Sequence, residues 1–355
     1  MKTLLTGRCG CFKLISLYVK NYANHNYLKQ ENPLIKLLVT AVLALLGLHA
    51  YAQDLKTYPN KPVKIVVPFT AGSLVDVLGR AIGDELQTQL KQSFVIDNKA
   101  GASTLLAAKM VATAPPDGYT LMLPTVTTLS LGPQLMTNPG FDPLKDLTPI
   151  ARLGLTNFFL VVNPNFPARN VKDWIEAVRK NPGKYSYASS GNGSPQHIFM
   201  ELLKKQLSLN LIHVPYKGSN TSMVDLLSGQ VDMAFIDGTL AIPHLKTNKL
   251  FALGTSMAKR TVLVPSIPPI AETVPGFDWS GWIAFAGPPH MPAAVVDVLS
   301  DRIRKFQATP AYAALLDKAA MEPSEPLSPG EMAEFVKKEY KRWSPAIQNS
   351  GAVMD

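Results

Sequence analysis

The sequence predicts an α/β protein with mainly parallel sheets, arranged in two domains. Short apolar runs of strand length alternate with stretches of helical periodicity along most of the chain. Once an N-terminal leader is set aside, about 300 of the 355 residues remain, enough for two hydrophobic cores. We expect residues 53–157 together with 286–355 to form the first domain, and residues 158–285 to form the second.

The first strand–loop–helix unit is the most informative segment. Residues 63–67 are typical of a buried strand, Pro68 ends it, and Thr70-Ala71-Gly72 lets the backbone approach a ligand closely. The unpaired N–H groups at the start of the next helix can hold an anion, although a plain β–loop–α unit has the same pattern. That helix is predicted because apolar residues recur every four positions, at Leu74, Leu78, Ile82, Leu86 and Leu90.

The remaining elements continue this alternation. Residues 158–162 are the expected crossing into the second domain. The chain ends in three consecutive predicted helices, so we expect it to return and pack against the first domain. Strands are predicted at 94–96, 119–123, 158–162, 185–188, 211–214, 233–236, 251–255 and 283–286, and helices at 104–112, 171–180, 195–207, 222–227, 293–306, 311–319 and 331–347.

The N-terminus has the features of an export signal. Residues 34–48 form an apolar run that is too short to span a bilayer comfortably. Lys29 precedes this run and Ala50-Tyr51-Ala52 supplies an A-x-A site, so we expect a signal peptide in residues 1–52, cleavage near Ala52-Gln53 and a periplasmic mature protein. A retained N-terminal anchor is the alternative, and a true start codon near Leu28 would remove the polar residues before the run.

Most of the net charge of +9 belongs to the leader. Residues 1–52 hold six of the 35 basic and one of the 26 acidic side chains, which leaves a net charge of about +4 for the rest. This modest charge removes the main argument for nucleic-acid binding. Both cysteines, Cys9 and Cys11, also lie in the leader, so the mature chain is expected to form no disulfide.

Three loops rich in small polar residues follow predicted strands, at residues 125–128, 189–194 and 237–239. Ligands of open α/β sheets bind beyond the carboxyl ends of the strands, so these loops can converge on one site. Their hydroxyl and N–H groups suit a carboxylate or another polar anion. Helix capping is the other explanation, since Ser194 followed by Pro195 is a typical N-cap and N1 pair.

Ser73 and Asp76 are open to two interpretations. The pattern Ser-x-x-Asp is a variant of the capping box, with Ser73 as the N-cap and Asp76 closing back on it. Asp76 would repel an anion at this helix start unless the ligand carried an ammonium or a hydroxyl group. Because capping and ligand contact are compatible, both residues remain candidates for a ligand site.

The sequence gives little support for catalysis, because no common nucleophile, metalloprotease, phosphate-loop or dinucleotide motif occurs in it. Ser194 and His197 lie one helical turn apart without an orienting acid, and His197 with Glu201 would supply only two metal ligands. His213 is expected to be a strand residue near the cleft. We predict no catalytic residue, no metal and no cofactor, with a cleft hydrolase as the less favoured alternative.

A series of collinear motifs then points to a known family. The first is Tyr-Pro-Asn-Lys-Pro-Val-Lys-Ile-Val-Val-Pro-Phe-Thr-Ala-Gly at residues 58–72. Others are Asp97-Asn-Lys-Ala-Gly101, Pro116-Asp-Gly-Tyr-Thr-Leu121, Ser189-Ser-Gly-Asn-Gly193, His213-Val-Pro-Tyr-Lys-Gly218 and Leu226-Leu-Ser-Gly-Gln-Val231. Through these motifs, essentially all of residues 54–355 resembles the substrate-binding proteins of tripartite tricarboxylate transporters, the Bug or TctC-like family.

The resemblance implies a type II periplasmic binding protein fold, with two α/β domains joined by crossing strands and a cleft between them. It implies a monomer that delivers a small carboxylate to the membrane subunits of such a transporter, without catalysis and without a nucleic-acid partner. A subunit that presents its ligand to a sensor kinase of a two-component system is the alternative. The implied ligand-binding residues are Phe69, Thr70, Ala71, Gly72, Ser73, Asp76, Thr127, Thr128, Ser189, Ser190, Asn192, Gly193, Asp237 and Gly238.

The chain departs from the family pattern in its first loops. Relatives usually carry paired glycines, then a Pro or small residue and a Thr, where this chain has Gly72-Ser73-Leu74-Val75. Residues 102–104 are Ala-Ser-Thr rather than glycine-rich, and Pro124 replaces a usual glycine. The acid that matches Asp76 meets the amino group in relatives that bind acidic amino acids. The substitutions around it leave the identity of the carboxylate open.

Overall fold

The computed structural model describes residues 58–352. The chain divides into the compact units Met1–Tyr58 and Pro59–Asp355, and every helix and strand that the structure describes lies in the second unit. The predicted signal peptide and its cleavage site lie outside the described residues. None of the helices within 58–352 combines the length and the apolarity that a bilayer crossing requires.

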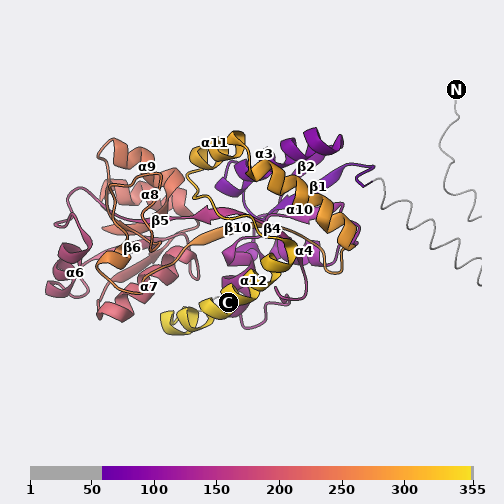
Figure 1. The fold of residues 1–355 in the computed structure, drawn as a ribbon. Helices are drawn as coiled ribbons and strands as arrows, with labels where there is room; N and C mark the ends of the chain where they lie inside the picture. The colour runs from indigo at the N-terminus through magenta and orange to yellow at the C-terminus, as the bar shows by residue number, and fades with distance from the viewer. Residues whose placement is uncertain (1–57, 353–355) are drawn as a thin grey trace, which may run out of the picture. The chain divides into compact units, whose positions relative to one another are not determined.

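Two five-stranded sheets form the centre of the second unit (Figure 1). The strands of the first sheet are β1 (Val63–Val67), β2 (Phe94–Asn98), β3 (Thr120–Met122), β4 (Thr148–Thr156) and β10 (Gly281–Gly287), and those of the second are β5 (Phe158–Val162), β6 (Ser186–Ser189), β7 (Ile212–Pro215), β8 (Met233–Asp237) and β9 (Phe251–Thr255).

The two sheets share one plan. The strand order is β2-β1-β3-β10-β4 in the first sheet and β7-β6-β8-β5-β9 in the second. In each sheet four strands point the same way, and the fourth in the order, β10 or β5, runs antiparallel to its neighbours. Every residue of β5 and of β10 is buried, as expected for apolar strands covered on both faces.

Helices cover both sheets. In Figure 1, helices α6 to α9 lie around the second sheet, whereas α3, α4, α10 and α11 lie around the first. The helices and short helical turns are α3 (Leu74–Leu90), η2 (Ala102–Thr104), α4 (Leu105–Ala112), η3 (Thr127–Leu131), α5 (Gly132–Leu135), α6 (Val171–Lys180), α7 (Pro195–Leu207), α8 (Ser219–Ser228), α9 (Gly238–Lys246), η4 (Ile270–Glu272), α10 (Ala293–Gln307), α11 (Pro310–Lys318) and α12 (Pro329–Ser350).

Two strand crossings connect the sheets. The chain passes from β4 through Asn157 directly into β5, and it returns from β9 to β10. Ser256, just after β9, ties the crossings together: its backbone N–H donates to the Phe158 carbonyl at 2.8 Å, and its own carbonyl accepts from the Trp279 N–H at 2.8 Å. Strand β10 pairs with the first sheet from Gly281 onward. By this pairing, the chain re-enters the first domain near Gly281, a few residues before the expected boundary after residue 285.

Sequence patterns missed several elements of this fold, of which β4 and α9 are the longest. Strand β4 contains Pro149, Arg152 and Gly154, which interrupt the apolar pattern of a strand. Helix α9 begins at a glycine and contains Pro243, both of which argue against a helix on propensity alone. Tertiary pairing with β10 and the packing of α9 on β5 and β8 outweigh these local preferences.

The C-terminal helix α12 packs against elements of both domains, whereas the sequence suggested that the C-terminal helices pack against the first domain. It contacts β4 and η3 on one side and α7 on the other. Trp343, which is fully buried, lies with its ring 5.9 Å from Phe199 of α7 and 4.7 Å from Trp279. Arg342 pairs with Glu339 of the same helix at 3.1 Å and also donates to the Asp278 carbonyl. The helix therefore joins the two domains through an aromatic core.

We expect Trp343→Ala to lower the free energy of unfolding by about 3–5 kcal/mol, because it leaves a large cavity among rings from both domains. Chemical denaturation followed by circular dichroism measures this loss. Lys341→Ala, on the exposed side of the same helix, should stay within about 0.5 kcal/mol of the wild-type value. Equal losses for the two variants would contradict the role given to Trp343.

Candidate functional site

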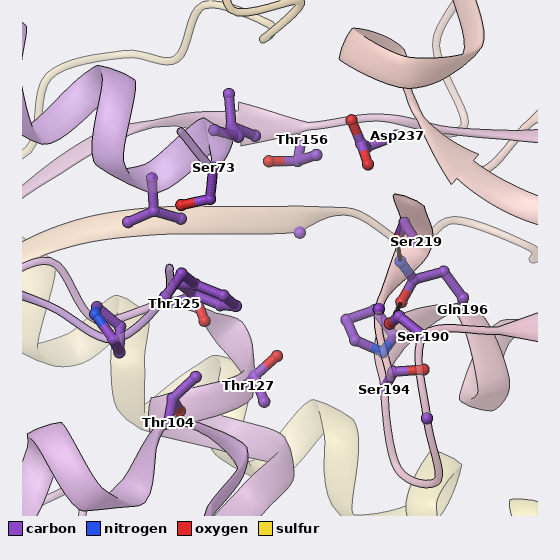
Figure 2. A pocket seen from close by; sticks show the side chains of 18 of the residues that line it. Ser73, Thr104, Thr125, Thr127, Thr156, Ser190, Ser194, Gln196, Ser219 and Asp237 are labelled. Carbon is purple, nitrogen blue, oxygen red and sulfur yellow. Dashed lines mark hydrogen bonds between the residues drawn. The ribbon is translucent and has the colours of Figure 1, made fainter. Parts of the chain in front are cut away.

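A cleft of about 740 Å³ opens beyond the carboxyl ends of the parallel strands (Figure 2). Six loops line it, one after each of the strands β1, β2, β3, β6, β7 and β8. The loop residues lie in the ranges 68–75, 100–104, 125–127, 190–196, 217–221 and 237–240, and the crossings contribute Thr156, Phe158, Gly281, Trp282 and Ile283. The crossings between the two sheets thus bring together loops that are distant in sequence.

Hydroxyl groups dominate the polar lining. Figure 2 shows Thr104, Thr125 and Thr127 on one side of the cleft and Ser190, Ser194 and Ser219 on the other. Lys217 and Asp237 are the only charged side chains among the described residues that line the cleft. No group of three or more possible metal-ligating side chains occurs within residues 58–352. The site is therefore built to hydrogen-bond a small polar molecule through neutral donors.

Four helices begin at the cleft, which places their positive ends near a ligand. Ser73, Ser194 and Asp237 cap α3, α7 and α9 with their side chains. Helix α8 instead has Gly218 as its N-cap, without a side-chain cap. Unpaired N–H groups and the helix dipole favour an anion at such ends. The arrangement supplies partial positive charge while the cleft carries little net charge of its own.

The structure brings most of the sequence-predicted residues to the cleft surface. Of the others, Asp76, Thr128, Ser189 and Gly238 are buried, and Ala71 is exposed outside the lining. Those that line the cleft are Phe69, Thr70, Gly72, Ser73, Thr127, Ser190, Asn192, Gly193 and Asp237.

Asp76 stabilises the first loop from the inside. Its side chain is buried, and its two carboxylate oxygens accept four hydrogen bonds: two from Arg80 at 3.0 and 3.1 Å, one from the Gly72 N–H at 2.9 Å and one from Asn98 at 2.9 Å. Burial alone would raise the pKa of Asp76, but these hydrogen bonds outweigh it and lower the pKa. Ser73 caps the helix by accepting from the Asp76 N–H at 3.3 Å, while the Asp76 carboxylate closes on Gly72 rather than on Ser73.

Thr128 has a similar supporting role behind the third loop. Its hydroxyl donates to the Thr104 hydroxyl at 2.8 Å and accepts from the Thr125 N–H at 3.1 Å. It is fully buried and positions two threonines that do line the cleft. The hydroxyl of Thr125 is buried and has no hydrogen-bond partner among the described residues.

The loop from Gly101 to Thr104 is strained. Ala102, Ser103 and Thr104 have φ values of 44°, 48° and 76°, in the left-handed region that favours glycine. These are the positions where the sequence departs from the glycine-rich pattern of its relatives. The Thr104–Thr128 hydrogen bond helps to hold this loop at the edge of the cleft.

A stack of three rings supports the second-domain loop. His213 lies between His197 and Tyr187, with ring centroids 4.0 and 4.8 Å away. His197 Nδ1 accepts from the Gly193 N–H at 3.1 Å, and His213 Nε2 lies 2.7 Å from the Ser189 hydroxyl. Glu201 is occupied by Tyr187 and by Lys204, the latter at 2.6 Å. The histidines are thus committed to shaping the loop, not to a nucleophilic pair or a metal.

Both histidines are held neutral by their surroundings. Burial, followed by the proximity of His197, lowers the pKa of His213 to about 4. Burial also lowers the pKa of His197, against the attraction of Glu201. A neutral His197 is required, because its Nδ1 must accept the Gly193 N–H.

Gly238 is needed for close packing rather than for ligand contact. A Cβ at this position would lie 2.9 Å from the Cβ of Ala320 and 3.1 Å from the Ala320 carbonyl. The start of α9 therefore approaches the segment after α11 more closely than any larger residue would allow.

Sequence reasoning missed several residues that line the cleft, notably the 217–221 loop and Leu240. Local sequence marks them only as the start of a helix. The signal that could have found them is their position directly after parallel strands, β7 and β8, because all six such strands contribute lining loops.

Comparison with known proteins agrees with this architecture. Residues 78–352 match the family described as the tripartite tricarboxylate transporter family receptor, and the chain belongs to that family. A UPF0065 protein of Bordetella pertussis is 32% identical over 321 residues, which cover 90% of this chain and 97% of that protein. The family resemblance inferred from the sequence motifs is thereby confirmed.

Solved structures confirm the fold. The R. palustris protein Rpa4515 with adipate superposes with a TM-score of 0.77 at 32% identity and covers 83% of this chain and 99% of its own. MatC from Rhodopseudomonas palustris with bound malate gives a TM-score of 0.73 at 28% identity, with 82% and 100% covered. The chain has the expected periplasmic binding protein fold of two α/β domains joined by crossing strands.

We expect Asp76→Asn to lower the free energy of unfolding by about 2 kcal/mol, more than a simple cap would, because it breaks a buried charge-assisted network. Urea denaturation of the two proteins measures the difference. Asp84→Asn, on the exposed face of α3, is the matched control and should change stability by less than about 0.5 kcal/mol. A loss no greater than that of Asp84→Asn would show that the network contributes little.

The stability of the wild-type protein should depend on His213 in a pH-dependent way. The pKa of His213 is depressed in the folded state, so the unfolded state binds more protons between about pH 6.5 and pH 4, and stability is lost as the pH falls through that range. We expect the stability advantage of wild type over His213→Gln to shrink by about 1–2 kcal/mol between about pH 7.5 and pH 5. Denaturation at both pH values measures it, and a constant advantage would refute the depressed pKa.

Proposed function

We propose that the chain is an extracytoplasmic solute-binding protein that captures a small carboxylate in the cleft and delivers it to the membrane subunits of a tripartite tricarboxylate transporter. The observation that carries the proposal is the cleft itself, where hydroxyl groups and helix N-termini converge from both sheets. Such a lining binds an anion mainly through neutral donors, with Lys217 as the only cation among the described residues that line the cleft. A ligand held mainly by neutral donors is also released more readily than one held by several ion pairs.

The relatives support a carboxylate as the ligand. The structures of Rpa4515 and MatC contain adipate and malate. The present chain aligns with nearly all of each, and we extend carboxylate binding to it on that basis. No catalytic role follows from the site, since the Ser194 side chain caps α7 and the nearby histidines are engaged with the loop backbone and Ser189.

The ligand in this proposal lies between two sets of contacts. The first domain contributes the start of α3 with Ser73, together with the hydroxyl of Thr127. The second domain contributes Ser190, Asn192 and the start of α8. Closure of the domains around the ligand would create the surface that the membrane subunits recognise. We further propose that the protein acts as a monomer in the periplasm, after cleavage of its signal peptide.

A thermal-shift screen of the purified protein tests the proposal. The panel holds aliphatic dicarboxylates and tricarboxylates, hydroxy acids, acidic amino acids and aromatic carboxylates. A ligand at about 100 times its Kd should add about 2.7 kcal/mol to the free energy of unfolding and raise Tm clearly. The protein is first unfolded and refolded to remove any bound ligand. If no acid in the panel raises Tm, carboxylate capture is contradicted.

The adjacent threonines Thr127 and Thr128 separate ligand contact from structural support. Thr127 lies on the cleft surface (Figure 2), so Thr127→Val should weaken the best ligand by about tenfold and leave stability within about 0.5 kcal/mol. Thr128→Val should instead cost about 1–3 kcal/mol of stability, because the Thr125 N–H and the Thr104 hydroxyl each lose a partner. Calorimetric titration and denaturation measure the two effects. Unchanged affinity in Thr127→Val would exclude that hydroxyl from the site.

A further inference from the structure

We infer that Asp237 makes the cleft selective for carboxylates that also carry a hydrogen-bond donor, a hydroxyl or an ammonium group. The inference rests on the proposed function and names the chemical class of the ligand within it. It concerns a residue at the junction of β8 and α9, on the second-domain wall of the cleft (Figure 2).

The two oxygens of the Asp237 carboxylate have different surroundings. Oδ1 caps α9: it accepts the Thr239 N–H at 3.1 Å and also the Thr239 hydroxyl. Oδ2 accepts no hydrogen bond from the residues that the structure describes, and no cation within them pairs with the carboxylate. Capping therefore uses only one oxygen, and the other is available to a ligand in the cleft.

Asp237 is also the only acidic side chain among the described residues that line the cleft. Asp76, the other acid near the ligand loops, has both of its oxygens occupied by Arg80, Gly72 and Asn98. The role of recognising a donor group, which Asp76 could have had on sequence grounds, thus passes to Asp237. The two acids lie in different domains, so the donor of the ligand is expected to face the second domain.

The charges around the cleft explain why Asp237 would favour a ligand with a donor group over one without it. A carboxylate ligand is attracted by the helix starts and by Lys217, but any second anionic group near Asp237 meets a like charge in a partly desolvated space. A hydroxyl or an ammonium group at the same place donates to Oδ2 and forms a charge-assisted hydrogen bond instead. When a binding site contains a polar group that hydrogen-bonds the ligand, an analogue that lacks the matching group leaves the site's group unpaired. The site therefore discriminates strongly against such an analogue.

Because Asp237 is charged, the start of α9 is expected to bind a different group of the ligand from the starts of α3 and α8. At α9 the carboxylate already compensates the positive end of the helix dipole. Helix α8, with Gly218 as its cap, keeps its N–H groups without a compensating side chain. The carboxylate of the ligand is therefore expected at the α3 and α8 starts and its donor group at α9.

Matched acids test the inference directly. Calorimetric titration compares succinate, malate and aspartate, which share a four-carbon dicarboxylate and differ in having no donor, a hydroxyl or an ammonium group. Glutarate with glutamate, and adipate as a longer acid without a donor, extend the comparison. We expect the acids with a donor to bind at least about tenfold more tightly than their plain counterparts.

Asp237→Asn is the key variant, because asparagine caps helices as well as aspartate does and keeps the shape. We expect the preference for the donor-bearing acid over its plain counterpart to fall by about tenfold or more in this variant. Asp317→Asn, on the exposed side of α11, makes the same charge change away from the cleft and should keep the wild-type preference.

Three outcomes would overturn the inference. Plain dicarboxylates could bind the wild-type protein as tightly as malate or aspartate. Asp237→Asn could alter all the acids by one common factor, which would reflect a general effect on the loop. Failure of every acid to bind the wild-type protein would remove the proposed function and this inference together, whereas the first two outcomes leave carboxylate capture intact.

Discussion

The two strand crossings set the geometry on which the site depends. Since the chain passes from β4 into β5 with only Asn157 between them, and returns from β9 to β10, the parallel strands of both sheets end at the walls of one cleft. The hydrogen bonds of Ser256 hold the crossings together, and the aromatic contacts of Trp343 join the domains elsewhere. The closure proposed above would therefore have to change the crossings and the Trp343 contacts together.

The walls of the cleft combine two kinds of residue. Hydroxyl groups and helix starts make up most of the polar surface that faces the ligand, and buried residues behind them fix the loops. Asp76 holds the first loop through Gly72, Thr128 holds Thr104 and Thr125, and His197 holds Gly193. Burying polar groups behind the lining costs free energy unless they form hydrogen bonds, so most of them have partners.

The fold could be predicted well from the sequence because buried parallel strands appear as short apolar runs and several of the helices carry clear side-chain caps. The prediction missed β4, whose Pro149 and Gly154 disguise a strand defined by tertiary pairing, and α9, whose Pro243 argues against a helix. For the site, the loops that follow the strands could be identified from the sequence, but the orientation of their side chains could not. Whether Asp76 faces a ligand or Arg80, and whether Thr127 or Thr128 points into the cleft, depends on side-chain packing that sequence pattern does not encode.

The central claim is that this cleft captures one small organic anion per chain. Isothermal titration calorimetry of the refolded protein with the strongest acid of the screen tests it most directly, with a second acid added as a competitor. We expect a single site per chain and complete competition between the two acids. Binding of several anions per chain, or of two acids without competition, would contradict a single interdomain site and would place the interaction elsewhere on the molecule.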